Sequence, residues 1–243
     1  MKHIASLIAV FTVMLCALLF STVAYATGSI QISPLRLVLS DTVNTTTLIV
    51  KNRANTPSLV QLELLAWSQQ NNAEILEPTR DILISPPVFT IVANSEQILR
   101  VVLRRKADSN KELTYRLFLR EVEDKSQIAK AGEIKVLLNI SIPIFVQPMI
   151  KPQPKLLWRA SVDAAQKIQL KLINEGNQHI QIKSFQLTSG DKNLYQSSMR
   201  YVLPGSTVEW VLDAKGLTLN SFLSLQAVTD NGDLRETITL EKP

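Results

Sequence analysis

The sequence predicts an all-β protein built from two β-sandwiches in tandem, and three observations support this fold class. Short runs with apolar residues at every second position recur along the chain, which is typical of strands with one buried face. Turn residues separate the runs, and no long stretch has the period of an amphipathic helix. Prolines at 148, 152 and 154 then divide the runs into two blocks of roughly 120 and 90 residues, each long enough for a core.

The N-terminus predicts a cleavable secretory signal peptide. Lys2 precedes an apolar run from Ile4 to Phe20, and the segment Ala24–Ala26 fits the small-x-small cleavage rule. A transmembrane anchor is the alternative, but the Ala-Tyr-Ala ending and the turn residues after it favour cleavage. Cys16, the only cysteine, lies inside the signal. We therefore expect residues 1–26 to be removed, and a cysteine-free protein to reach the periplasm without stable membrane insertion.

The alternating runs give the expected elements of each domain. In the N-terminal domain (27–147) the expected strands are 29–39, 45–53, 58–67, 97–105, 112–122 and 133–147. A stiff proline-rich linker (148–155) follows. In the C-terminal domain (156–243) the expected strands are 166–174, 178–187, 207–213, 220–229 and 234–241, with turns at 175–177, 189–191, 204–206 and 230–232.

The strand expected at 133–147 has one strongly apolar face and an edge position. Its alternating residues are Ile134, Val136, Leu138, Ile140 and Ile142. Pro143 has no N–H for a sheet ladder, so this strand belongs on an edge or at a bulge. A long apolar edge strand promotes aggregation unless it has a partner. The alternative is that the five side chains face their own domain's core.

The residue types argue against catalysis. The sequence has a formal net charge of +5, but no basic cluster accompanies a nucleic-acid-binding module. After signal removal it has one histidine, His179, and no cysteine, so a zinc site or a thiol nucleophile is not expected. No Gly-x-Ser-x-Gly elbow or glycine-rich phosphate loop is present. We expect no enzyme, no cofactor and no nucleic-acid partner, and His179 to be a solvent-facing strand residue.

Five segments, taken in order, resemble motifs of the periplasmic pilus chaperones of the chaperone–usher pathway. They are "SPLRLVLS" (33–40), "SPPVFTI" (85–91), "EQILRVVL" (96–103), "ELTYRLFLREV" (112–122) and "TDNG" (229–232). The resemblance implies two immunoglobulin-like β-sandwich domains in an L or boomerang arrangement. It also implies an ATP-independent chaperone that caps pilus subunits and delivers them to an outer-membrane usher.

In this family the seventh strand of the first domain is donated to a pilus subunit that lacks its own last strand. This is β-strand addition, and it requires alternating apolar residues, as found here from Ile134 to Ile142. The resemblance places Arg36 where members carry a cleft arginine for the subunit's C-terminal carboxylate. Glu112 and Asp230 match the acidic members of an interdomain ionic cluster.

Two positions depart from the conventional pattern and resemble the archaic (σ-type) branch instead. Pro143 occupies the position of the lysine that pairs with the cleft arginine, and Gln147 that of the cluster's arginine. A hairpin centred near residue 126 would put Arg116 opposite Leu137 and diagonal to Lys135. Arg116 with Lys135 is therefore the predicted carboxylate anchor, with Arg36 as the family's default. The alternative is that Arg116 and Lys135 are ordinary solvated charges.

Other classes of protein remain as alternatives. A pilin or adhesin with two immunoglobulin-like domains would present an N-terminal donor segment, whereas this protein begins on a strand after its signal. A solute-binding protein would normally show α/β alternation, which the sequence lacks. The sequence leaves open which subunits are bound and whether the free chaperone self-associates.

Overall fold

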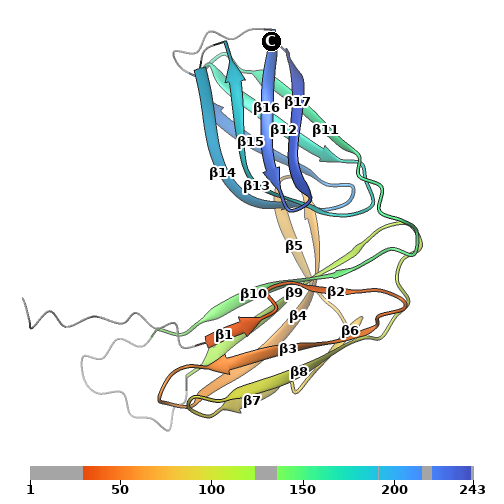
Figure 1. Cartoon of the computed structure of the whole chain (residues 1–243), viewed down its shortest axis with the longest axis vertical. Coiled ribbons are helices and arrows are strands. Elements are labelled where there is room, and N and C mark those ends of the chain that lie inside the picture. Colours follow the sequence, from red (N-terminus) through yellow and green to blue (C-terminus); the bar gives the residue numbers. More distant parts are fainter. Residues whose placement is uncertain (1–29, 124–135, 191, 215–220, 242–243) are drawn as a thin grey trace, which may run out of the picture.

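The computed structural model describes residues 30–123, 136–190, 192–214 and 221–241, and these form strands and turns without a helix. The strands make two lobes, one above the other and steeply inclined, so the molecule is bent (Figure 1). The first lobe contains β1 to β10 and the second contains β11 to β17. Both lobes are β-sandwiches, as the alternation predicts. No helix of the described residues is long and apolar enough to cross a membrane.

The first domain consists of two sheets facing each other. The four-stranded sheet has the order β1-β3-β8-β6, and the six-stranded sheet has the order β2-β10-β9-β4-β5, with β7 paired to β4. The strands are β1 (Ile30–Ser33), β2 (Leu37–Leu39), β3 (Thr45–Asn52), β4 (Ser58–Gln70), β5 (Ala73–Pro78), β6 (Ile82–Ser85), β7 (Val88–Ile91), β8 (Glu96–Leu103), β9 (Leu113–Val122) and β10 (Asn139–Val146).

Alternate side chains of the two sheets fill one core between them. Leu48, Leu99, Val101, Leu117 and Ile144 are among its fully buried members. Because successive side chains of a strand point to opposite faces, the residues between them form the outer faces. The six-stranded sheet therefore has a second face, and at one end that face meets the second domain.

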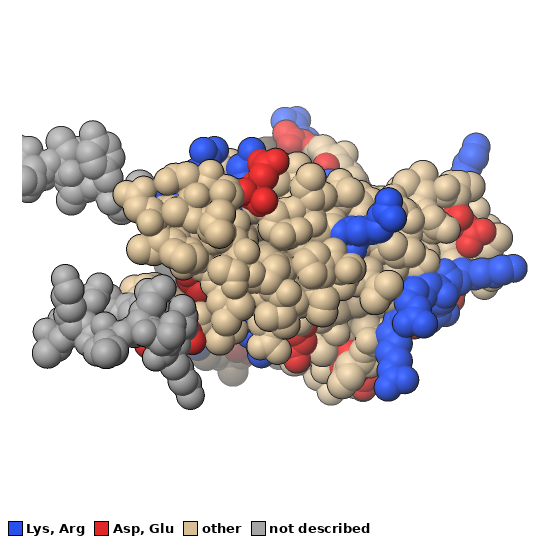
Figure 2. Space-filling view, turned by 90° about the horizontal axis from the view of Figure 1, so that it is seen from below, with Lys and Arg blue, Asp and Glu red and all other residues tan. Residues whose placement is uncertain are grey.

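The outer face of the four-stranded sheet carries exposed apolar side chains. Leu83 lies between the buried residues Ile82 and Ile84, and Ile98 precedes the buried Leu99, so Leu83 and Ile98 point away from the core. Seen from below, the first domain presents a broad surface with few Lys, Arg, Asp or Glu side chains (Figure 2). Most of the charged side chains in this view lie toward the margins of that surface.

The second domain is formed by one continuous path of seven strands. Their order is β14-β13-β16-β17-β11-β12-β15, and the path folds over so that two layers enclose a core with Trp158, Phe185 and Trp210. The strands are β11 (Leu156–Val162), β12 (Lys167–Asn174), β13 (Ile180–Ser189), β14 (Lys192–Val202), β15 (Thr207–Asp213), β16 (Phe222–Thr229) and β17 (Gly232–Glu241).

The turn between β16 and β17 holds an acidic residue toward the first domain. Gly232 has φ +110°, a conformation that favours glycine. The Thr229 hydroxyl oxygen accepts a hydrogen bond from the Asn231 N–H at 3.0 Å. Asp230, fixed between them, accepts the Gln181 N–H at 2.8 Å. The "TDNG" segment is therefore a tight turn, and it orients the Asp230 carboxylate.

Candidate binding site at the domain junction

Part of β10 has a free edge. On one side, β10 pairs with β9 from Asn139 to Val146. On the other side, β2 pairs in parallel only with Ile144–Val146. Among the described residues, no strand pairs with that side of Asn139–Pro143. The backbone groups of this segment can therefore accept an additional strand, which must end where β2 begins.

The alternating apolar residues pass from this free edge into the domain's own core. Val136 is 75% exposed, Leu138 and Ile140 are half-buried, and Ile142 is 1% exposed within the core cluster. Ile142 is thus not available to a partner, and its inclusion with the donated residues is wrong. The predicted donor residue Ile134 and the predicted anchor residue Lys135 lie outside the described residues.

Two arginines flank Pro143 at the end of the free edge. The register of β9 and β10 places Arg116 opposite Pro143, so the predicted pairing of Arg116 with Leu137 is wrong. Arg36 immediately precedes Leu37, which pairs with Ile144, so the parallel register places Arg36 level with Pro143 on the other side. The structure therefore brings together the two arginines that the sequence offered as alternatives.

Arg116 is held by stacking and by an ion pair. Its guanidinium carbon lies 3.7 Å from the centre of the Trp67 ring, within the range of a cation–π contact. Its Nη2 lies 3.0 Å from Glu74 Oε1 on β5, and its side chain is 14% exposed. The same guanidinium carbon is 5.6 Å from the Tyr201 ring of the second domain. Arg116 is therefore preorganised and mostly desolvated, unlike an ordinary solvated strand charge.

Charged groups form a relay across the domain boundary, which we call the ionic relay. His179 Nδ1 lies 2.6 Å from Glu112 Oε2, and the same oxygen accepts the His179 backbone N–H at 2.9 Å. His179 Nε2 lies 3.5 Å from Asp230 Oδ2, which accepts a 2.8 Å hydrogen bond from Arg36 Nη1. The order is Glu112, His179, Asp230 and Arg36, so the ionic relay begins and ends in the first domain.

The expectation that His179 faces solvent is wrong. Its imidazole is buried, as is the carboxylate of Glu112, and the ring stacks on Phe145 with centroids 3.6 Å apart. His179 directly precedes β13 and packs against Phe145 of the first domain rather than continuing an alternating strand. Gln147, at the position of the family's cluster arginine, is exposed. His179 thus lies between the two acids as the cationic centre that the sequence had left unfilled.

The surroundings shift the pKa values of the ionic relay in opposite directions. Burial lowers the pKa of His179, but Asp230 and Glu112 outweigh burial and raise it above the ordinary value. Burial raises the pKa of Asp230, but His179, the Gln181 N–H and Arg36 together lower it to about 2. Both shifts favour a positively charged imidazole beside an ionised Asp230 carboxylate at mildly acidic pH.

Aromatic side chains from both domains pack around these charges. Trp67 and Phe145 come from the outer face of the six-stranded sheet, and Leu203 and Tyr201 come from the second domain. The Tyr201 ring meets Trp67 edge-on with centroids 5.5 Å apart, and it lies 5.7 Å from the ring of Phe145. This small separate core excludes water from the junction and holds Arg116 and His179 in position.

The β4–β5 hairpin forms a second contact with the second domain, made by its side-chain amides. In Figure 1 it reaches upward from the first lobe to the base of the second. Gln69 donates to Tyr201 O and accepts the Leu203 N–H, both at 2.9 Å. At the hairpin's tip, Asn72 Oδ1 accepts the Glu209 N–H at 3.0 Å and an Arg200 N–H at 2.9 Å.

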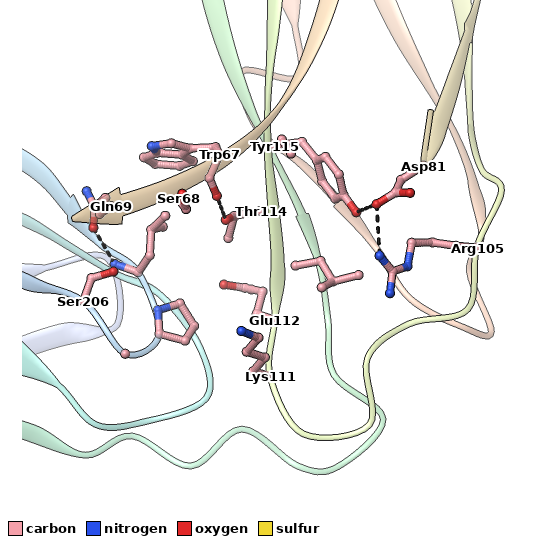
Figure 3. A pocket seen from close by; sticks show the side chains of 15 residues that line it. Trp67, Ser68, Gln69, Asp81, Arg105, Lys111, Glu112, Thr114, Tyr115 and Ser206 are labelled. Carbon is pink, nitrogen blue, oxygen red and sulfur yellow. Dashed lines mark hydrogen bonds and ion pairs between the residues drawn. The ribbon is translucent and has the colours of Figure 1, made fainter. Parts of the chain in front are cut away.

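A cavity of about 320 Å³ lies between the hairpin, the start of β9 and the 203–206 turn. Figure 3 shows Gln69 directed toward that turn, with Glu112 and Lys111 on the opposite wall. Tyr115 Oη donates to Asp81 at 2.8 Å on the far side. The described residues contain no group of three or more His, Cys, Asp or Glu that could hold a metal ion.

Comparisons with known proteins show the family and the fold. A model of the family described as "Pili and flagellar-assembly chaperone, PapD N-terminal domain" matches residues 29–151, half of the 243-residue sequence. The Escherichia coli chaperone protein AggD is 24% identical over 229 residues, covering 86% of this sequence and 83% of AggD.

Solved structures of pilus chaperones share the fold. One protein of the complex between the CsuC chaperone and the CsuE tip subunit, from the archaic Csu pili of Acinetobacter baumannii, matches with a TM-score of 0.66, 20% identity and coverage of 87% of this protein and 99% of that one. One protein of the Salmonella enterica SafA pilin–SafB chaperone complex matches with a TM-score of 0.61 and 20% identity, covering 88% of this protein and 98% of that one. The E. coli chaperone DraB matches with a TM-score of 0.59 and 21% identity, covering 86% of this protein and 98% of DraB.

The two-sandwich fold and the matching family define the class of protein, which is a chaperone of pilus assembly. More particularly, the protein belongs to the family of pili and flagellar-assembly chaperones with a PapD N-terminal domain.

Proposed function

We propose that this protein is an ATP-independent periplasmic chaperone that caps pilus subunits by β-strand addition and passes them to an outer-membrane usher. The observation that carries the proposal is the free edge of β10, which stops at the two arginines flanking Pro143. An incoming strand would bond to Asn139–Pro143 and continue along the exposed Val136 and the half-buried Leu138. Family membership and the pilin and tip-subunit complexes of SafB and CsuC support this reading.

The arginines also give the added strand a direction. The strand must end beside Pro143 because β2 occupies the edge of β10 from Ile144 onward. If its last residue is the C-terminus of the subunit, its carboxylate lies next to Arg36 and Arg116, and the strand runs parallel to β10. Charge-assisted hydrogen bonds are about twice as strong as neutral ones, so this contact fixes the register. We infer that Arg36 and Arg116 together are the anchor, and Lys135 stays a candidate.

Replacing Val136 with Asp tests the proposal. Val136 is 75% exposed, so the substitution should leave the free chaperone folded. In the complex, burial of a valine contributes about 1.5–3 kcal/mol, and an unpaired carboxylate there would cost several kcal/mol more. We therefore expect subunit co-purified from periplasmic extracts to fall to background, whereas Val211→Asp, an exposed valine of the second domain, should retain it.

The measurement is co-expression with pilus subunits of the same genome, together with the melting temperature of each free variant. If the wild type retains no subunit, or Val136→Asp retains as much as the wild type, strand addition along this edge is excluded. If Val136→Asp unfolds the free protein, the side chain serves the domain's own core instead.

A further inference from the structure

The Tyr201 hydroxyl lies in an unusual position for a tyrosine of the second domain. Its ring belongs to the aromatic cluster at the junction and is half-buried. The ring centre lies 5.6 Å from the guanidinium carbon of Arg116 and 5.7 Å from the ring of His179. Burial raises the pKa of the hydroxyl above its ordinary value, although the positive charges of Arg36 and Arg116 act to lower it. Tyr201 thus lies beside Arg116 and beside the His179 imidazole, whose neighbour Asp230 binds Arg36, although Tyr201 belongs to the other domain.

The hydroxyl has no hydrogen-bond partner among the described residues. The hydrogen bond between Tyr201 and Gln69 does not involve the hydroxyl, because the Tyr201 backbone carbonyl accepts it from the Gln69 side-chain amide. The Arg116 guanidinium beside the phenol has only donors, so it cannot accept the hydroxyl proton. A group that brings acceptor oxygens into this space can satisfy the hydroxyl, and a carboxylate does so while also pairing with the arginines.

The arginines themselves retain donors for such a group. Arg36 uses Nη1 on Asp230 and its side chain is 44% exposed, so its other N–H groups face outward. Arg116 uses Nη2 on Glu74. A guanidinium has five N–H donors, and a carboxylate can accept about four hydrogen bonds. The site therefore has room for one more donor beyond those of the two arginines.

We propose that Tyr201 is a third binding residue of the anchor and donates its hydroxyl to the C-terminal carboxylate of the bound subunit. This inference rests on the proposed function, because it takes the subunit's carboxylate to lie between Arg36 and Arg116. It adds that the second domain contacts the subunit directly. It also makes Tyr201 a specificity residue, since an amidated or extended C-terminus lacks the carboxylate that satisfies the hydroxyl.

Tyr201→Phe removes the hydroxyl and leaves the aromatic packing intact. Tyr195→Phe is the matched control, because Tyr195 lies on the same strand and is 70% exposed. The probe is a synthetic peptide copying the last strand of a co-purified subunit, made once with a free C-terminal carboxylate and once as the amide. Binding of both peptides is measured for the wild type, the two variants and Arg116→Ala.

We expect Tyr201→Phe to weaken binding of the carboxylate peptide about tenfold or more, the range for a hydrogen bond to a charged group. Binding of the amide peptide, and the melting temperature of the free chaperone, should not change. Tyr195→Phe should match the wild type, and Arg116→Ala should lose affinity for the carboxylate peptide alone.

Two results would overturn the inference and leave the proposed function intact. In the first, Tyr201→Phe binds the carboxylate peptide with wild-type affinity. In the second, Tyr201→Phe loses affinity equally for both peptides, which would indicate a packing role. If the wild type binds neither peptide nor subunit, the proposed function fails, and the inference fails with it.

Discussion

The two contacts between the domains differ in kind. The ionic relay joins Glu112, His179, Asp230 and Arg36 through charges, of which that of Arg36 alone is exposed. The hairpin contact uses the neutral amides of Gln69 and Asn72, which bond to backbone groups and to the Arg200 guanidinium. Charges held out of water depend on one another and on pH, while amide hydrogen bonds do not titrate. The comparison shows how one junction combines a contact that responds to its environment with one that does not.

Removing Glu112 should have the largest effect. Glu112→Ala leaves His179 buried with its backbone N–H and Nδ1 unpaired, and breaking a buried pair in this way costs about 3–5 kcal/mol. We expect a loss of that size in the free energy of unfolding by urea. Glu63→Ala is the control, because Glu63 pairs with Arg120 at the surface, where a pair contributes about 1 kcal/mol or less. Equal losses for the two variants would contradict the assignment of the buried relay.

Changing the pH should affect the ionic contact alone. The pKa of His179 is raised in the folded protein, so its contribution to stability is fully present below the unfolded value of about 6.5 and is lost as the pH rises through the folded pKa. The lowered pKa of Asp230 acts oppositely, because its contribution is present above about 3.9 and is lost as the pH falls toward about 2.

Urea unfolding at a series of pH values checks this dependence. The wild type should lose stability between mildly acidic and alkaline pH, and His179→Gln, which cannot titrate, should follow a flatter curve. His179 is the only histidine within residues 30–241, so no other imidazole contributes. Parallel curves for the two proteins over this range would show that His179 is neutral in the junction.

Altering the hairpin tip should have the smallest effect. Asn72 has φ +64°, so Asn72→Gly removes its amide without straining the backbone. The hydrogen bonds to Glu209 and Arg200 are exposed, and we expect a loss of about 1 kcal/mol that does not vary with pH.

Hydrogen exchange of the Glu209 N–H should also become faster in Asn72→Gly. Asn71→Gly, at φ +50° and without a described interdomain hydrogen bond, is the matched control. Protection of the Glu209 N–H that survives Asn72→Gly would exclude the hairpin contact in solution.

The sequence predicted the fold well where strands have one buried face. Alternation located β3, β8, β9 and β12 close to their observed bounds. It missed β5 and β14, whose side chains are mostly exposed or half-buried, so neither strand has the apolar period that marks a half-buried strand. It also missed β6 and β7, which have one buried face but only four residues each, and β11, which directly follows the proline-rich linker. Burial on one face leaves a pattern in the sequence, and edge strands exposed on both faces leave none.

The site was only partly predictable for a related reason. Arg36, Glu112 and Asp230 were proposed from motifs, and Arg116 from an assumed register of β9 and β10. That register was wrong, because the connecting segment has no tight-turn signal to fix its centre. His179, Tyr201 and Trp67 act through contacts between domains, which a strand pattern does not record. One signal pointed to His179: two acids kept at the junction without their arginine require another cation.

Arg36 belongs to both the ionic relay and the proposed anchor, and this shared membership makes two equilibria interdependent. A carboxylate that draws Arg36 toward itself weakens the hold of Arg36 on Asp230, and Asp230 then acts more strongly on the imidazole. If a bound subunit raises the affinity of His179 for its proton, thermodynamic reciprocity requires that protonation of His179 raises the affinity of the chaperone for the subunit by the same factor. The pH and the affinity for the subunit would thus be coupled through the guanidinium of Arg36.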